Sequence, residues 1–116
     1  MTSPAPNHVQ AGYVSVLLYV PSALKLALAG ASRQFGRIQR DLYHQAIEDF
    51  IAWHEASRRG PTPNYRPLYR AGDAIPLRMW IKKGLLDEVV RFARIAHIQR
   101  REFIYTALVR RFGSEA

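Results

Sequence analysis

Hydrophobic residues alternate with other residues in two short segments of the chain, and this period of two predicts two β-strands. The first strand covers residues 14–20 and is ended by Pro21, and the second covers residues 75–81. The alternating hydrophobic positions are Val14, Val16, Leu18 and Val20 in the first strand and Ile75, Leu77, Met79 and Ile81 in the second. Each strand therefore has one apolar face that must be covered by other parts of the chain.

Each predicted strand is followed by two stretches in which hydrophobic residues recur at helical spacing. In the first half, one helix is expected to be capped by Ser22 and stopped by Gly36, and a second helix is expected over residues 39–57. The predicted apolar stripes are Leu24, Leu28, Ala31 and Phe35; Leu42, Tyr43, Ala46, Ile47, Phe50, Ile51 and Trp53; Leu85, Val89, Phe92 and Ala96; and Phe103, Ile104, Ala107, Leu108 and Phe112.

The two halves of this pattern superimpose without gaps when the chain is shifted by 61 residues. The shift places Leu18 on Met79, and it aligns the helical stripes in the same way. A single strand cannot satisfy its own backbone hydrogen bonds, whereas two such strands can pair antiparallel with four helices behind them. The sequence therefore predicts an α+β, mostly helical fold, in which a strand-helix-helix unit occurs twice and forms a single-chain pseudodimer.

The chain of 116 residues suits one small domain. We expect this domain over residues 13–112, with its two repeats at 13–57 and 74–112. Residues 1–12 contain two prolines and no apolar period, which is typical of a disordered arm. Residues 58–73 are rich in proline and glycine and are interpreted as a linker, and residues 113–116 as a tail.

The net charge of the chain indicates which classes of binding partner are favoured. The chain has 17 Lys and Arg against 9 Asp and Glu, and its net charge is +8. Thirteen of these cations lie between residues 58 and 111, against four acidic residues. A strongly basic surface favours a polyanion, either nucleic acid or an acidic membrane surface.

Other chemistry has little support in the sequence. There is no cysteine, which excludes a disulfide, a thiol nucleophile and a thiolate zinc site. The four histidines have no metal-ligand spacing, and no catalytic triad or phosphate-binding glycine motif is found. The apolar run over residues 11–31 has Pro21 in its middle and a charged residue, Lys25, inside it, which argues against a signal peptide or membrane helix. We therefore expect a cytoplasmic protein that is not an enzyme, with no metal, no cofactor and no membrane partner.

The segment at residues 36–47, GRIQRDLYHQAI, resembles the turn and second helix of the ribbon-helix-helix DNA-binding superfamily. Residues 100–108, RREFIYTAL, are similar to the same helix in the second half, where His97 stands in the place of Gly36. The fused pair of units also resembles the layout of VirC-type accessory proteins of T-DNA transfer. This resemblance implies binding to double-stranded DNA near a transfer origin or border, and assistance to a relaxase.

In this superfamily the two-stranded ribbon enters the major groove, so its outward side chains are the expected base contacts. Alternation assigns this role to Ser15, Leu17, Tyr19, Pro76, Arg78 and Trp80. Arg78 is the expected donor to guanine. Phosphates are expected at the starts of the second helices and just past the second strand, at Arg37, Gln39, Arg40, Lys82, Lys83, Gln99, Arg100 and Arg101. Four linker arginines, Arg58, Arg59, Arg66 and Arg70, are expected to extend this footprint.

Two alternatives stay open at this point. A transcriptional regulator with the same fold uses the same ribbon and the same DNA contacts, so the sequence does not separate it from a transfer factor. The outward face of the ribbon is also less polar than expected for a protein that recognises a specific base sequence. It fits either DNA binding dominated by phosphate contacts or a module that docks on another protein. In each case we expect a monomer, because its two halves satisfy each other.

Overall fold

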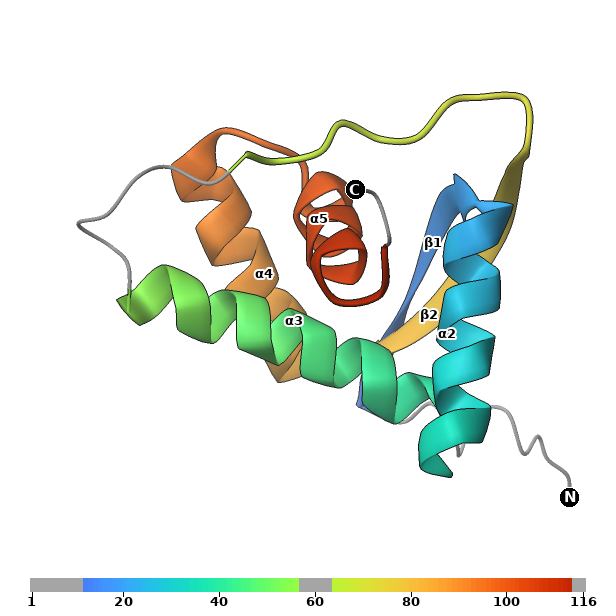
Figure 1. Ribbon diagram of the computed structural model, residues 1–116. Helices are drawn as coiled ribbons and strands as arrows, with labels where there is room; N and C mark the ends of the chain where they lie inside the picture. Colours follow the sequence, from blue (N-terminus) through green and yellow to red (C-terminus); the bar gives the residue numbers. More distant parts are fainter. Residues whose placement is uncertain (1–11, 57–63, 114–116) are drawn as a thin grey trace, which may run out of the picture.

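The computed structural model describes residues 12–56 and 64–113. Predictions for residues 1–11, 57–63 and 114–116 lie outside these described residues. The fold is α+β and mostly helical, with a two-stranded sheet and four helices among the described residues (Figure 1). In chain order the elements are β1 (Tyr13–Pro21), α2 (Ser22–Phe35), α3 (Gln39–Ala56), β2 (Ala74–Lys82), α4 (Lys83–Ala96) and α5 (Arg100–Phe112).

The two strands form an antiparallel ribbon that joins distant parts of the chain. Tyr13 is paired with Lys82 at one end, and Pro21 is paired with Ala74 at the other. The predicted apolar face is confirmed, because Val16, Leu18, Val20, Leu77, Met79 and Ile81 are all buried. Leu17 lies opposite Arg78 at the middle of the ribbon.

The order strand, helix, helix occurs twice, and each element of the second half begins 61 residues after its counterpart in the first. Both first helices end in the same way. Gly36 follows α2 with φ 64°, and His97 follows α4 with φ 62°. The left-handed conformation carries no Cβ penalty at glycine but strains histidine, so the two turns have the same shape at different energetic cost.

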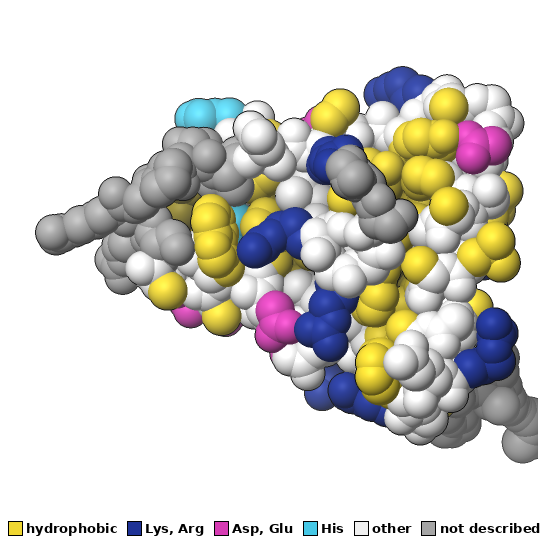
Figure 2. Space-filling model, viewed as in Figure 1, with side chains coloured by type: hydrophobic (Ala, Val, Ile, Leu, Met, Phe, Trp, Pro, Cys, Tyr) yellow, Lys and Arg dark blue, Asp and Glu magenta, His cyan; other side chains and the backbone are white. Residues whose placement is uncertain are grey.

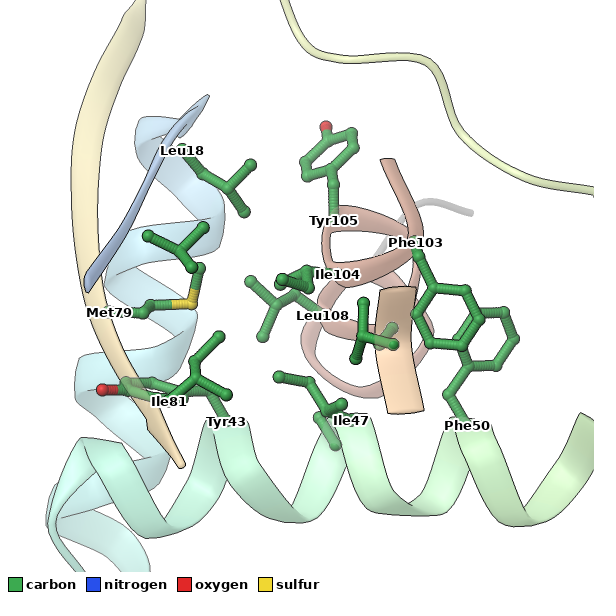
Figure 3. Packing of buried hydrophobic residues seen from close by; sticks show 14 of the residues in the cluster. Leu18, Tyr43, Ile47, Phe50, Met79, Ile81, Phe103, Ile104, Tyr105 and Leu108 are labelled. Atoms are coloured by element: carbon green, nitrogen blue, oxygen red, sulfur yellow. The ribbon is translucent and has the colours of Figure 1, made fainter. Parts of the chain in front are cut away.

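The core lies between the ribbon and the helices. Figure 1 shows α5 in the centre, with α3 below it, α4 on one side, and the ribbon with α2 on the other. In Figure 3, Leu18 and Met79 point from the ribbon toward Leu108 of α5. Phe50 of α3 packs on Phe103 of α5, with their ring centroids 4.8 Å apart. The helices therefore cover one face of the ribbon, and its other face points outward.

Several details of the predicted helices are wrong. Ser22 is not the cap of α2, because Pro21 holds that position without a side-chain hydrogen bond. Phe35 is 60% exposed, because it stands in the last turn of α2, beyond the buried Leu24 and Leu28. In α4 the buried residues are Leu86, Val89 and Ala93, while Leu85, Phe92 and Ala96 are only partly buried.

The predicted linker is packed onto the domain where the structure describes it, from residue 64 onward. It crosses α5 on its way to β2 (Figure 1). The Arg66 amide donates to Thr106 Oγ1 at 2.8 Å, and the Tyr65 hydroxyl lies 2.6 Å from His54 Nε2. Leu68 and Tyr69 also pack against the core. This segment has a fixed path, which composition alone does not predict.

Candidate nucleic-acid interface

The six residues predicted to face outward alternate with the buried ones along both strands, as expected. Tyr19, Pro76 and Arg78 are exposed, and Ser15, Leu17 and Trp80 are partly buried. Arg78 Nη1 donates to Ser15 Oγ at 2.6 Å, across the ribbon. A guanidinium group has five donors in a planar fork, so this bond leaves other donors of Arg78 available for a ligand.

The outward face is longer than the sequence predicted. Alternation from Ser15 places Tyr13 on the same face, and Lys82 lies opposite Tyr13 in the pairing. Lys82 is thus the last residue of the ribbon rather than a residue beyond it, and Lys83 is the first residue of α4. Extending the period-two pattern by one step would have identified Tyr13.

The first turns of α3 bind the free edge of β2. The Tyr43 hydroxyl accepts a hydrogen bond from the Trp80 amide at 2.8 Å and donates to the Trp80 carbonyl at 3.2 Å. His44 Nε2 accepts from the Lys82 amide at 3.1 Å, and Nδ1 lies 2.7 Å from the Arg40 carbonyl. Burial raises the pKa of Tyr43, although its bond to the Trp80 backbone opposes this. These bonds fix the β2 backbone beneath Trp80 and Lys82.

His44 of α3 is buried, with 8% of its surface exposed. Its Nε2 accepts from an amide, and a carbonyl oxygen can only accept, so Nδ1 carries the proton and donates to Arg40. The ring therefore has a structural role at the ribbon edge. The nearby Tyr13 ring meets it edge-on.

The start of α3 brings cations to one end of the ribbon. The Arg40 guanidinium lies 5.0 Å from the Tyr13 ring centroid, close enough for a cation–π interaction. Tyr13 is paired with Lys82, so Arg40 and Lys82 belong to the same end of the ribbon. Arg37 is exposed in the turn, and Gln39 begins α3.

The start of α5 lies at the β1 side of the ribbon. The Gln99 amide donates to Glu102 Oε1 at 2.8 Å, which closes the first turn with an acidic side chain. Arg100 and Arg101 are both exposed. Arg101 lines a groove together with Tyr19 of β1, whereas Arg100 lines a separate hollow beside α4. The structure thus places Arg101, and not Arg100, beside the outward ribbon.

Arginine and lysine are distributed over the face seen in Figure 2, with fewer acidic side chains among them. Within residues 12–56 and 64–113, no group of three or more His, Asp or Glu is placed to hold a metal ion. None of the described helices is long and apolar enough to span a membrane. Positive charge beside an outward ribbon is the chemistry that this site offers.

Comparison with protein-family models, with curated proteins and with solved structures finds no match to this chain.

Proposed function

We propose that this chain is a tandem ribbon-helix-helix protein that binds double-stranded DNA by inserting its ribbon into the major groove. The observation that carries this proposal is the antiparallel ribbon itself, which has one buried face and one outward face with Arg78 at its centre. The major groove is about 12 Å wide and admits a two-stranded ribbon. The repeated order of elements and their spacing of 61 residues support two fused units.

In this complex, Arg78 donates to guanine O6 and N7, and Ser15 holds the arginine toward the ribbon axis until DNA is bound. Arg40 and Arg101 approach the phosphate backbone from opposite sides of the ribbon. The amides that open α3 and α5 add donors with a favourable dipole. Phosphate contacts therefore supply most of the affinity, and the ribbon supplies discrimination.

The apolar outward residues limit how many bases are read by hydrogen bonds. Leu17 and Trp80 suit thymine methyl groups and sugars, and Tyr19 adds one hydroxyl. Such a face discriminates partly through the shape and stiffness of the DNA. We expect a modest specificity and a strong dependence of affinity on salt.

For the biological process, we propose an accessory role in conjugative or T-DNA-like DNA transfer, in the cytoplasm, with a relaxase among the partners. The similarity of layout to VirC-type accessory proteins supports this role. Transcriptional regulation by the same DNA contacts is the alternative. The position of the bound site decides between them, since a transfer factor binds beside a nick site and a regulator binds beside a promoter.

The first experiment is selection of the full chain on randomised duplex DNA at physiological salt. Enrichment of a short site is expected, and Arg78→Ala should then lose about 1 to 3 kcal/mol of discrimination at one base pair. Arg101→Ala should weaken binding to all sequences and reduce the salt slope by at most about 0.9. Arg111→Ala is the control, because it removes the same charge from a residue that is paired with Asp49 on α3.

The proposal is wrong if the wild-type chain does not bind duplex DNA. It is also wrong if the Arg78→Ala, Arg101→Ala double variant binds duplex DNA as tightly as Arg111→Ala does. Binding of the double variant to another protein, with no DNA affinity, would instead favour a protein-docking module.

A further inference from the structure

A groove of about 280 Å³ runs along the β1 side of the ribbon, where residues 68–70 pass close to the strand. Its walls come from three separate parts of the chain. Tyr19 belongs to β1, Arg101 belongs to the first turn of α5, and Tyr69 and Arg70 belong to the segment before β2. The groove thus joins the outward ribbon to the segment that connects the two halves.

The groove is basic. Arg70 and Arg101 both line it, and none of its lining residues is acidic. Both arginines are exposed, and neither forms an ion pair within residues 12–56 and 64–113. The carboxylate nearest to Arg70 along the chain, that of Asp73, accepts a hydrogen bond from the Tyr69 hydroxyl, and that of Glu102, next to Arg101, accepts one from the Gln99 amide. Two guanidinium groups on one groove repel each other, and an anion between them removes this repulsion.

The path of the segment carrying Arg70 is fixed at several points. The Arg66 amide donates to Thr106 Oγ1 of α5, and Thr106 Oγ1 in turn donates to the Glu102 carbonyl at 2.8 Å. At the other end, the Ala74 amide donates to the Ala71 carbonyl at 3.1 Å. Arg70 lies between these attachments, so binding an anion here costs little ordering of the backbone.

We propose that Arg70 and Arg101 form a clamp for a DNA backbone phosphate beside β1, an inference that rests on the proposed DNA-binding function. The occupant is a phosphodiester, because the groove opens next to Tyr19 of the outward ribbon and offers two cations from separate elements. Arginine binds phosphate oxygens in a planar, bidentate way, and two arginines match one phosphate group well.

Within residues 12–56 and 64–113, the clamp has no counterpart on the other side of the ribbon. A shift of 61 residues relates Arg101 to Arg40, and Arg40 stacks on Tyr13 instead of facing a second arginine. The segment with Arg70 occurs once in the chain. The protein therefore grips the DNA strand beside β1 more firmly than the strand beside β2, and it binds an asymmetric site in one preferred orientation.

The affinity test compares Arg70→Ala with Arg111→Ala on the same short duplex across a series of salt concentrations. Both variants lose one positive charge, so a general electrostatic effect is equal in the two. If the clamp forms, Arg70→Ala weakens binding about tenfold more than Arg111→Ala, as expected for a hydrogen bond to a charged group. It also reduces the salt slope, by less than about 0.9, because Arg101 still contacts the same phosphate.

The orientation test uses the absence of cysteine from the sequence. Ala71 is exposed beside Arg70, so Ala71→Cys gives a single thiol for an iron-chelate reagent that cleaves DNA and leaves Arg70 intact. On an end-labelled duplex enriched by the selection, we expect cuts on one side of the site only. Ala56→Cys, at the exposed end of α3, is the matched control and should give no focused cuts.

The outcomes separate the two proposals. If the wild-type chain does not bind duplex DNA, the proposed function is wrong and the clamp with it. If the wild-type chain binds but Arg70→Ala behaves like Arg111→Ala in affinity and salt slope, the clamp alone is wrong. Equal cutting on both sides of the site by the labelled Ala71→Cys chain also overturns the preferred orientation.

Discussion

Replacement of Tyr43 by phenylalanine tests how the helices hold the ribbon edge. Tyr43 is 5% exposed, and its hydroxyl forms hydrogen bonds to both the amide and the carbonyl of Trp80. The substitution keeps the ring but leaves these two backbone groups without their partner. Loss of a partner at a buried polar group costs about 1 to 3 kcal/mol. We expect Tyr43→Phe to lower the free energy of unfolding by that amount.

Urea unfolding followed by circular dichroism measures this loss. With an m-value of about 1.5 kcal/mol/M, a loss of about 2 kcal/mol lowers the midpoint by about 1.3 M. Tyr19→Phe removes the same atom from a residue that is 52% exposed, and it should change stability by less than about 0.5 kcal/mol. In the Tyr43 variant, hydrogen exchange at the Trp80 amide should also accelerate. Equal midpoints for the two variants, with unchanged exchange, would refute this account of the ribbon edge.

Four further outcomes are expected. Phe103→Ala should cost about 3 to 5 kcal/mol in thermal unfolding, because the ring is fully buried. His97→Gly should stabilise the chain by about 1 kcal/mol and Gly36→Ala should destabilise it by a similar amount in urea unfolding, because both positions have positive φ. Burial lowers the pKa of His54 below its usual 6.5. As the pH falls, His54 is therefore protonated in the unfolded chain before it is protonated in the folded chain, so the free energy of unfolding decreases below about pH 6.5. This decrease should be smaller in His54→Gln. Light scattering should give the mass of one chain, and an obligate dimer would contradict the internal pairing of the two halves.

The elements of this fold could be predicted because their signals are local. Alternation at period two marks both strands, and Pro21 and Gly36 stand where β1 and α2 end. The face of α4 could not be chosen in the same way. Its sequence has adjacent apolar residues, Leu85 and Leu86, so a wide arc of the helix is hydrophobic and only packing decides that Leu86 is buried.

The groove beside β1 could not be predicted from the sequence, for a different reason. Prolines and glycines around residues 58–73 indicate a linker, and the described part of this stretch has no helix or strand before Ala74. The signal for packing is the spacing of Tyr65, Leu68 and Tyr69 within this stretch. Because the residues that they meet are distant in the chain, such as His54, only the folded structure shows where Arg70 lies.

The pair at the centre of the ribbon has a consequence for how such a protein can evolve. Leu17 and Arg78 face each other there, and both come from one chain. If two identical subunits built this ribbon, one codon would set both central side chains, and two arginines placed there would repel each other. In a single gene that encodes both halves, each central residue mutates independently. Under the proposed DNA-binding function, the ribbon can therefore contact a non-palindromic sequence through its central pair of residues, which a symmetric homodimer cannot do.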